Sequence, residues 1–135
     1  MIKLKLITLG KLKEKYLREA ADEYVKRLSA YANTEIIELE PVKLPESPSD
    51  AEVERALLTE AEMIKKKLTT YINSGRGELV FIIGSSFGLH ESIKTLADIK
   101  LSFSAMTFPH QLFRIMLLEQ VYRSFKIAEG SRYHK

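Results

Sequence analysis

Hydrophobic and polar positions along the chain follow a strand pattern, then a helix pattern, then a strand pattern again. Residues 2–9 are apolar with partial alternation and stop at Gly10, which predicts a strand. Over residues 17–28, small or apolar side chains recur at the spacing of one buried helical face. Residues 35–40 alternate again and end at Pro41, which predicts a second, half-buried strand.

A loop and one very long helix come next. Prolines between positions 41 and 48 prevent regular strand pairing there. Ser49 and Glu52 form the capping-box pattern of a helix whose apolar positions continue at helical spacing to Tyr71. Read literally, this helix has about 24 residues, about twice the mean of roughly 11 to 12 residues in globular proteins.

The C-terminal part adds two further predicted strands. Residues 79–83 are continuously apolar, which is typical of a strand buried on both faces of a parallel sheet. We expect a short helix over about residues 90–97 and another strand at residues 99–103, whose apolar side chains alternate. The predicted fold class is therefore α/β, a mostly parallel sheet flanked by helices, in one domain over residues 1–135.

The last predicted helix is unusually apolar. It begins at Pro109 and ends near Ala128, before Gly130. Apolar residues cover most of its circumference, which predicts burial on more than one side. A domain of this size can hardly bury such a helix alone, so we expect a homodimer.

Composition excludes several classes of protein. No apolar stretch approaches the roughly 20 residues that cross a bilayer, and the N-terminus has no secretory signal pattern, so we expect a soluble, cytoplasmic protein without a membrane partner. Cysteine is absent, which excludes disulfides and thiolate nucleophiles. His90 and His110 have no partner at metal-ligand spacing, so we expect no metal. The 21 basic and 18 acidic residues permit binding to a polyanion but do not require it.

Two segments are candidates for a ligand site. Gly84 and Gly88 follow the strand at residues 79–83, at the carboxyl end where an open α/β sheet binds nucleotides. Their spacing matches neither a dinucleotide fingerprint nor a P-loop, and an ordinary tight turn explains it equally well. The apolar and hydroxyl-rich residues 101–110 can line an adenine pocket, or they can form a buried connection that only packs.

The C-terminal tail is a third candidate. Arg132, Tyr133, His134 and Lys135 follow a helix that carries Arg123. Cations beside an aromatic ring and an imidazole can hold RNA phosphates and assist proton removal from a base. Most C-terminal tails fray, however, and residue types alone leave both interpretations open.

Five motifs in this order resemble one family. They are Phe81-Ile82-Ile83-Gly84, Gly88-Leu89-His90, the run from Leu101 to Gln111, Glu119-Gln120-Val121-Tyr122-Arg123, and Tyr133-His134-Lys135. With them, the chain resembles over nearly its whole length the RlmH family of ribosomal RNA methyltransferases. The resemblance implies a SPOUT-type fold, in which the C-terminal segment passes through a loop to form a trefoil knot, and a homodimer with shared sites.

The resemblance also implies an activity. The family transfers a methyl group from S-adenosylmethionine to a ring nitrogen of pseudouridine in large-subunit ribosomal RNA on the assembled ribosome, without a metal. By similarity, the cofactor is held by Gly84 and by a loop made of Phe103, Ser104, Ala105, Met106, Thr107 and Phe108. His134 is the candidate proton acceptor, and Arg123 and Tyr133 are further candidate catalytic residues.

The sequence departs from the family in two places. Ser85 stands where the family has a second glycine. The family also has a further strand and a glycine-containing loop between the positions of Lys67 and Leu68, and their absence explains the overlong helix. Both the knot and the cofactor pocket depend on that segment. The alternatives are a methyltransferase-like RNA- or ribosome-binding dimer with impaired cofactor binding, and an α/β domain that binds another nucleotide at Gly84.

Overall fold

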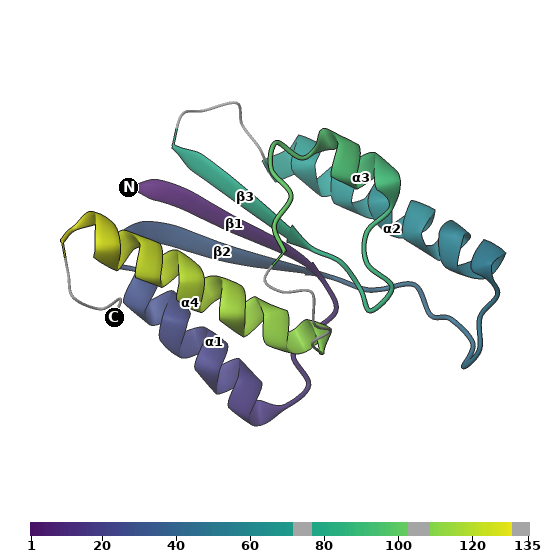
Figure 1. The fold of residues 1–135 in the computed structure, drawn as a ribbon, viewed down its shortest axis with the longest axis horizontal. Coiled ribbons are helices and arrows are strands. Elements are labelled where there is room, and N and C mark those ends of the chain that lie inside the picture. The colour runs from purple at the N-terminus through teal and green to yellow at the C-terminus, as the bar shows by residue number, and fades with distance from the viewer. Residues whose placement is uncertain (72–76, 103–108, 131–135) are drawn as a thin grey trace.

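A parallel three-stranded sheet lies between two pairs of helices in the computed structural model, which describes residues 1–71, 77–102 and 109–130 (Figure 1). Its elements are β1 (Ile2–Leu9), α1 (Lys15–Leu28), β2 (Ala32–Leu39), α2 (Asp50–Tyr71), β3 (Glu78–Ile83), α3 (Glu91–Leu96) and α4 (His110–Ala128). The strand order is β2-β1-β3, and both pairs are parallel. The predicted fold class is confirmed. The predicted knot involves residues outside the described ranges and stays a prediction.

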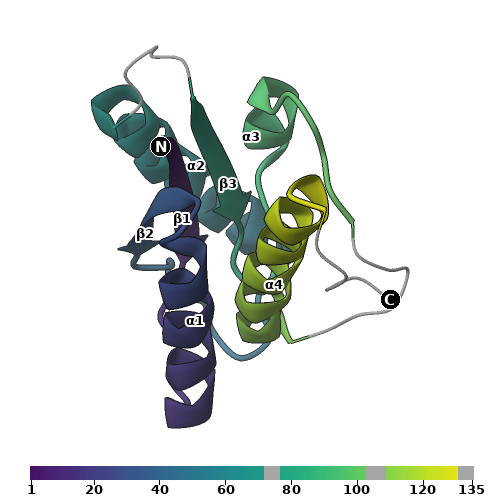
Figure 2. The same cartoon turned by 90° about the vertical axis from the view of Figure 1, so that its left-hand side faces the viewer.

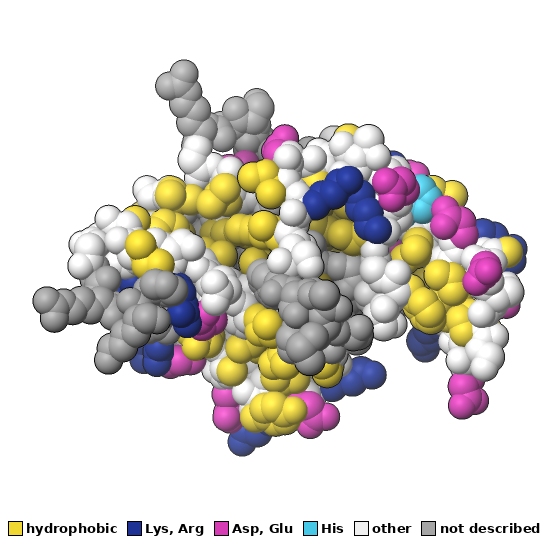
Figure 3. Space-filling model, viewed as in Figure 1, with side chains coloured by type: hydrophobic (Ala, Val, Ile, Leu, Met, Phe, Trp, Pro, Cys, Tyr) yellow, Lys and Arg dark blue, Asp and Glu magenta, His cyan; other side chains and the backbone are white. Residues whose placement is uncertain are grey.

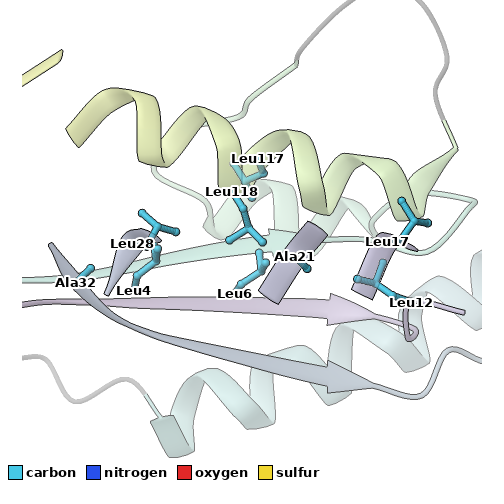
Figure 4. Packing of buried hydrophobic residues seen from close by; sticks show 9 residues of the cluster. All are labelled: Leu4, Leu6, Leu12, Leu17, Ala21, Leu28, Ala32, Leu117 and Leu118. Atoms are coloured by element: carbon cyan, nitrogen blue, oxygen red, sulfur yellow. The ribbon is translucent and has the colours of Figure 1, made fainter. Parts of the chain in front are cut away.

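Strand β1 is the centre of the molecule because its side chains alternate between two apolar layers. Leu4 and Leu6 belong to a buried cluster under α1 and α4, whereas Ile7 belongs to a second cluster under α2 and α3. Figure 4 shows the first cluster, with Leu117 and Leu118 between α4 and the sheet. Helices α1 and α4 lie side by side in both views (Figure 1, Figure 2). Burial on both faces explains why β1 has apolar residues on both of its faces, although Lys3 and Lys5 interrupt its first half.

Helix α2 runs without interruption for 22 residues. Its predicted capping box is confirmed: Ser49 Oγ accepts a hydrogen bond from the Glu52 N–H, and Glu52 Oε1 accepts one from the Ser49 N–H, each at 3.2 Å. Ile64 is fully buried in the cluster on this side of the sheet. The helix continues through Lys67 and Leu68, where the RlmH resemblance places an additional strand.

Strand β3 lies at the edge of the sheet, and none of its residues is fully buried. Leu79 is 46% exposed, and the other five residues are half-buried. The predicted strand is present and packs on both faces. Phe81 and Ile83 contact one apolar cluster, and Val80 and Ile82 contact the other. These side chains are only half-buried, and β1 is the only neighbour of β3 among the described strands. Figure 3 shows apolar side chains at the surface over β3.

The strand predicted at residues 99–103 is wrong for its described part, residues 99–102. Ile99 is 76% exposed and Leu101 is 62% exposed, outside the sheet. An alternating segment becomes a stable strand only where another strand pairs with it and an apolar layer covers one face. Phe103 lies outside the described residues.

Helix α4 buries one side fully. Leu117 and Leu118 are buried beneath it, together with the charged Arg114, whereas Ile127 in its last turn is 49% exposed. The homodimer expected from this helix stays a prediction. No helix in the described ranges combines the length and apolar character needed to span a membrane.

Candidate functional site at the carboxyl end of the sheet

The turn after β3 requires glycine at two positions. A Cβ atom on Gly84 would lie 2.3 Å from the Gly88 carbonyl oxygen, which no side chain can accommodate. Gly88 has a φ of +90°, and its N–H donates to the Ser85 carbonyl oxygen at 2.8 Å. A tight turn therefore accounts for both glycines. It lies where a parallel sheet presents its ligand end.

A buried carboxylate holds this turn in place. Glu60 on α2 is 4% exposed. Its Oε1 accepts a hydrogen bond from the Ser85 hydroxyl at 3.0 Å, and its Oε2 accepts one from the Val42 N–H at 3.0 Å. Ser85, the departure from the family pattern, thus has a structural partner. Glu60 was not predicted as a site residue, although a carboxylate between Leu57 and Ile64 on an apolar helix face was the available signal.

A buried arginine joins α4 to the carboxyl ends of β1 and β2. The Arg114 guanidinium donates to Glu38 Oε2 at 2.7 Å, to Thr8 Oγ1 at 2.9 Å and to the Gly10 carbonyl oxygen at 3.0 Å. Arg114 is only 6% exposed, so its charge depends on these partners. Arg114 was not predicted as a site residue. Its signal was a lone cation within the apolar first turns of the last helix.

The space between these groups is small. A cavity of about 10 Å³ is lined by the end of β1 and the residues after it, by Ile83 and Gly84, and by Gln111 and Arg114 of α4. This volume holds about one water molecule. Pockets for nucleotide-sized ligands measure about 300 Å³ or more. The described residues alone therefore do not offer room for a nucleoside cofactor.

A wider depression of about 260 Å³ lies at the amino end of the sheet, between Lys3, Lys5, Asn33 and Glu35. Lys5 makes an ion pair with Glu78 at 3.1 Å across this surface. Open parallel sheets bind ligands at the carboxyl ends of their strands, so we do not assign this depression to the site.

The predicted site residues are only partly placed by the structure. Gly84 lines the small cavity. Arg123 lies nine positions beyond Arg114 on α4, about 14 Å farther along the helix axis, and its Nε donates to Glu119 Oε1 at 2.9 Å. Arg123 is therefore not brought to Gly84 within one chain. The remaining predicted residues lie outside the described ranges: Phe103, Ser104, Ala105, Met106, Thr107, Phe108, Tyr133 and His134.

His90 has the structural role that its position predicts. It caps α3, with its Nδ1 accepting a hydrogen bond from the Ser92 N–H at 3.1 Å, and its Nε2 lies 2.9 Å from Glu54 Oε1. Among the described residues, no group of three or more histidines and carboxylates could hold a metal ion.

Fold and site together define an α/β protein whose candidate ligand end is the carboxyl edge of a parallel sheet. The sequence model of one family, described as "Predicted SPOUT methyltransferase", matches residues 2–71 and residues 59–134. The chain belongs to this family of methyltransferases.

Known relatives resemble the chain over nearly its full length. The "Ribosomal RNA large subunit methyltransferase H" of Streptococcus equi subsp. zooepidemicus is 42% identical over 159 positions, covering 99% of this chain and 100% of the relative. Proteins of Methanococcus maripaludis and Methanococcus vannielii, which carry the same name in provisional form, are each 45% identical over 155 positions. Each alignment covers 96% of this chain and 98% of the archaeal protein.

The comparisons also show that the chain lacks an internal segment of the family. The archaeal alignments span 155 positions, against 135 residues here, so at least 20 of these positions have no counterpart in this chain. The two matched stretches of the family model overlap over residues 59–71, in the second half of α2. The overlap agrees with the expected absence of a family segment between Lys67 and Leu68. That absence explains why α2 continues without interruption past this position.

Proposed function

We propose that this chain transfers a methyl group from S-adenosylmethionine to a ring nitrogen of pseudouridine in large-subunit ribosomal RNA on the assembled ribosome. The similarity of nearly the whole chain to relatives named ribosomal RNA large subunit methyltransferase H carries this proposal. The parallel sheet with its glycine turn supports it. The cofactor, when bound, supplies an activated methyl group, and the protein mainly aligns the reactants.

The cofactor assignment rests on Gly84 and residues 103–108. Pro109 precedes the first turn of α4, and Gln111 in that turn lines the same cavity as Gly84. The start of α4 therefore lies at the ligand end of the sheet. The cavity of about 10 Å³ does not fit the cofactor, so we derive no step through it.

The proposed proton acceptor is His134, with Arg123 and Tyr133 orienting the RNA and stabilising negative charge on the base. Because Arg123 lies away from Gly84 on α4, we propose that a second copy of the chain contributes it to the site. The proposed assembly is therefore a homodimer.

Methyl transfer from radiolabelled S-adenosylmethionine to large subunits or ribosomes tests the activity. We expect label in large-subunit RNA, mapped by mass spectrometry to a pseudouridine. His134→Ala should reduce the single-turnover rate by about 100-fold, within the usual range for a general base. His90→Ala is the matched control and should keep the rate. If His134→Ala has the wild-type rate at every pH, His134 is not the base.

A second candidate function is an RNA- or ribosome-binding dimer with impaired cofactor binding. The missing family segment and the small cavity favour it. Calorimetric titration with S-adenosylmethionine separates the two. Heat from S-adenosylmethionine binding, together with methyl transfer to RNA, supports the enzyme. RNA binding without heat from S-adenosylmethionine supports the second candidate.

A further inference from the structure

The loop between β1 and α1 carries an unusual excess of positive charge. We call residues 10–16 the basic loop; it contains Lys11, Lys13 and Lys15 against one carboxylate, Glu14. With Arg18 in the first turn of α1, the excess over residues 10–18 is three charges, as large as the net charge of +3 of the whole chain. The remainder of the chain is neutral on balance, although Lys65, Lys66 and Lys67 form a second basic run on α2.

The charged side chains of the basic loop and Tyr16 lie at the surface, whereas Leu12 is buried in the core. All three lysines are exposed, and Tyr16 is 67% exposed. Lys15 Nζ lies 3.7 Å from Glu19 Oε1, but both side chains are largely exposed, and such pairs are weak. Lys11 and Lys13 have no carboxylate partner in the described part of the chain. Their charges are therefore available to a ligand.

The backbone of the basic loop is fixed from both neighbouring helices. From α4, Gln111 Oε1 accepts a hydrogen bond from the Lys13 N–H at 3.1 Å, and Arg114 donates to the Gly10 carbonyl oxygen at 3.0 Å. From α1, Arg18 donates to the Leu12 carbonyl oxygen at 3.1 Å and to the Lys13 carbonyl oxygen at 2.7 Å. A loop held in this way loses little conformational freedom on binding.

The basic loop also lies beside the candidate site. Lys11 lines the small cavity together with Gly84 and Gln111. Figure 3 shows basic side chains along the lower rim of this face, around the beginning of α1, with acidic ones among them. A chain of RNA that reaches the carboxyl edge of the sheet would pass this loop.

We propose that the basic loop binds the phosphate backbone of the RNA substrate and that Tyr16 stacks on an unpaired base. The inference rests on the proposed function, whose RNA-binding surface it names. Lysines neutralise phosphates without reading sequence, and exposed aromatic rings beside cations stack on unstacked bases. We assign the loop to RNA rather than to an acidic protein surface because the relatives of this chain are named ribosomal RNA methyltransferases.

The test measures affinity for a fluorescent large-subunit RNA hairpin with an unpaired loop, as a function of salt. The loop variant replaces the three lysines of the basic loop by glutamine. The matched control replaces three exposed lysines on the α2 and α3 side, as Lys66→Gln, Lys94→Gln and Lys100→Gln. The slope of log K against log salt should decrease by about 2 for the loop variant, since each lost phosphate contact removes about 0.7 from the slope for single strands.

The slope of the control variant should differ from that of the wild-type protein by less than about 0.5, because its lysines lie away from the site. Tyr16→Leu should weaken binding at least about fivefold without changing the slope, and Tyr16→Phe should restore it. Equal slopes for the loop and control variants overturn the inference, as does wild-type protein that binds an acidic ribosomal protein but no RNA. Methyl transfer and cofactor heat are measured separately. If the wild-type protein binds RNA through the basic loop but transfers no methyl group, the result therefore contradicts only the proposed function.

Discussion

Strands β1 and β3 pack against the same two apolar clusters but have very different surroundings. In β1, Leu6 and Ile7 are each 1% exposed, because strands pair with both edges and helices cover both faces. In β3, five residues are half-buried, Leu79 is exposed, and none is fully buried. The difference shows that the burial of a strand depends on its neighbours: β1 has a strand on each edge, whereas β3 has one neighbour among the described strands.

The largest expected effect compares two isoleucines in register. Ile7 and Ile82 are paired across β1 and β3 and belong to the same apolar layer. Ile7→Ala should lower the free energy of unfolding by about 4 kcal/mol, and Ile82→Ala by about 2 kcal/mol, because the second site is half-buried and collapses more easily. Urea denaturation measures both. A difference below about 0.5 kcal/mol would contradict the contrast between the two strands.

The next effect concerns the connection between α4 and the β1–β2 side of the sheet. Arg114→Ala should cost about 3 kcal/mol, because it leaves buried acceptors on Thr8 and Gly10 and an unpaired Glu38. Glu38→Gln should cost only about 1 kcal/mol, because the Glu38 side chain is 34% exposed and water replaces the lost charge. The same denaturation experiment checks both. Equal costs for the two variants would show that the ion pair, rather than the buried hydrogen bonds, holds α4.

Much of the fold was predictable because local patterns and tertiary surroundings agree. The apolar run at residues 2–9, the helix at residues 17–28 and the capping box at Ser49 each appear in the structure at nearly the predicted positions. These signals depend on residues close in sequence. The helix over Lys67 and Leu68 was also predicted, along with the absent segment that explains its length.

The failures concern residues whose surroundings come from elsewhere in the chain. Residues 99–102 alternate like a strand, but no neighbouring strand is available to pair with them. Glu60 and Arg114 looked like isolated charges, and their importance comes from partners 18 to 106 positions away in sequence. Of the candidate site, the sequence indicated Gly84 and the end of the sheet. It did not indicate the side chains that fix the loops there.

Restoring the absent segment would sharpen the comparison between the strands. We expect that inserting the corresponding residues of the Methanococcus maripaludis relative between Lys67 and Leu68 will slow amide exchange in β3 and leave β1 unchanged. Affinity for S-adenosylmethionine should rise at least about tenfold, which corresponds to about 1.4 kcal/mol. A glycine-serine insert of equal length is the control. Equal affinities for the two inserts would show that the missing segment does not limit cofactor binding.

The smallest effect tests the contact between the end of α4 and the residue before β2. Tyr31 stacks on Phe125 at 5.2 Å between ring centroids. Burial, followed by the hydrogen bond with Glu129, raises the pKa of Tyr31 above 10.0. The hydrogen bond with Glu129 and that with Tyr31 raise the pKa of Lys126 to about 12. Both groups therefore favour the folded state fully below about pH 10, and this contribution is lost as the pH rises through their folded pKa values.

Glu129→Gln should lower the pKa of Tyr31 toward 10.0, because it removes a negative charge and an acceptor that favour the neutral phenol. Burial of the ring remains in this variant, so the shift should be incomplete. Residue-specific NMR titration of the tyrosine rings measures it. Glu119→Gln, which removes a carboxylate paired with Arg123 earlier on the same helix, is the control and should leave Tyr31 unchanged. An unchanged Tyr31 pKa in Glu129→Gln would mean that Glu129 at the end of α4 does not contact Tyr31.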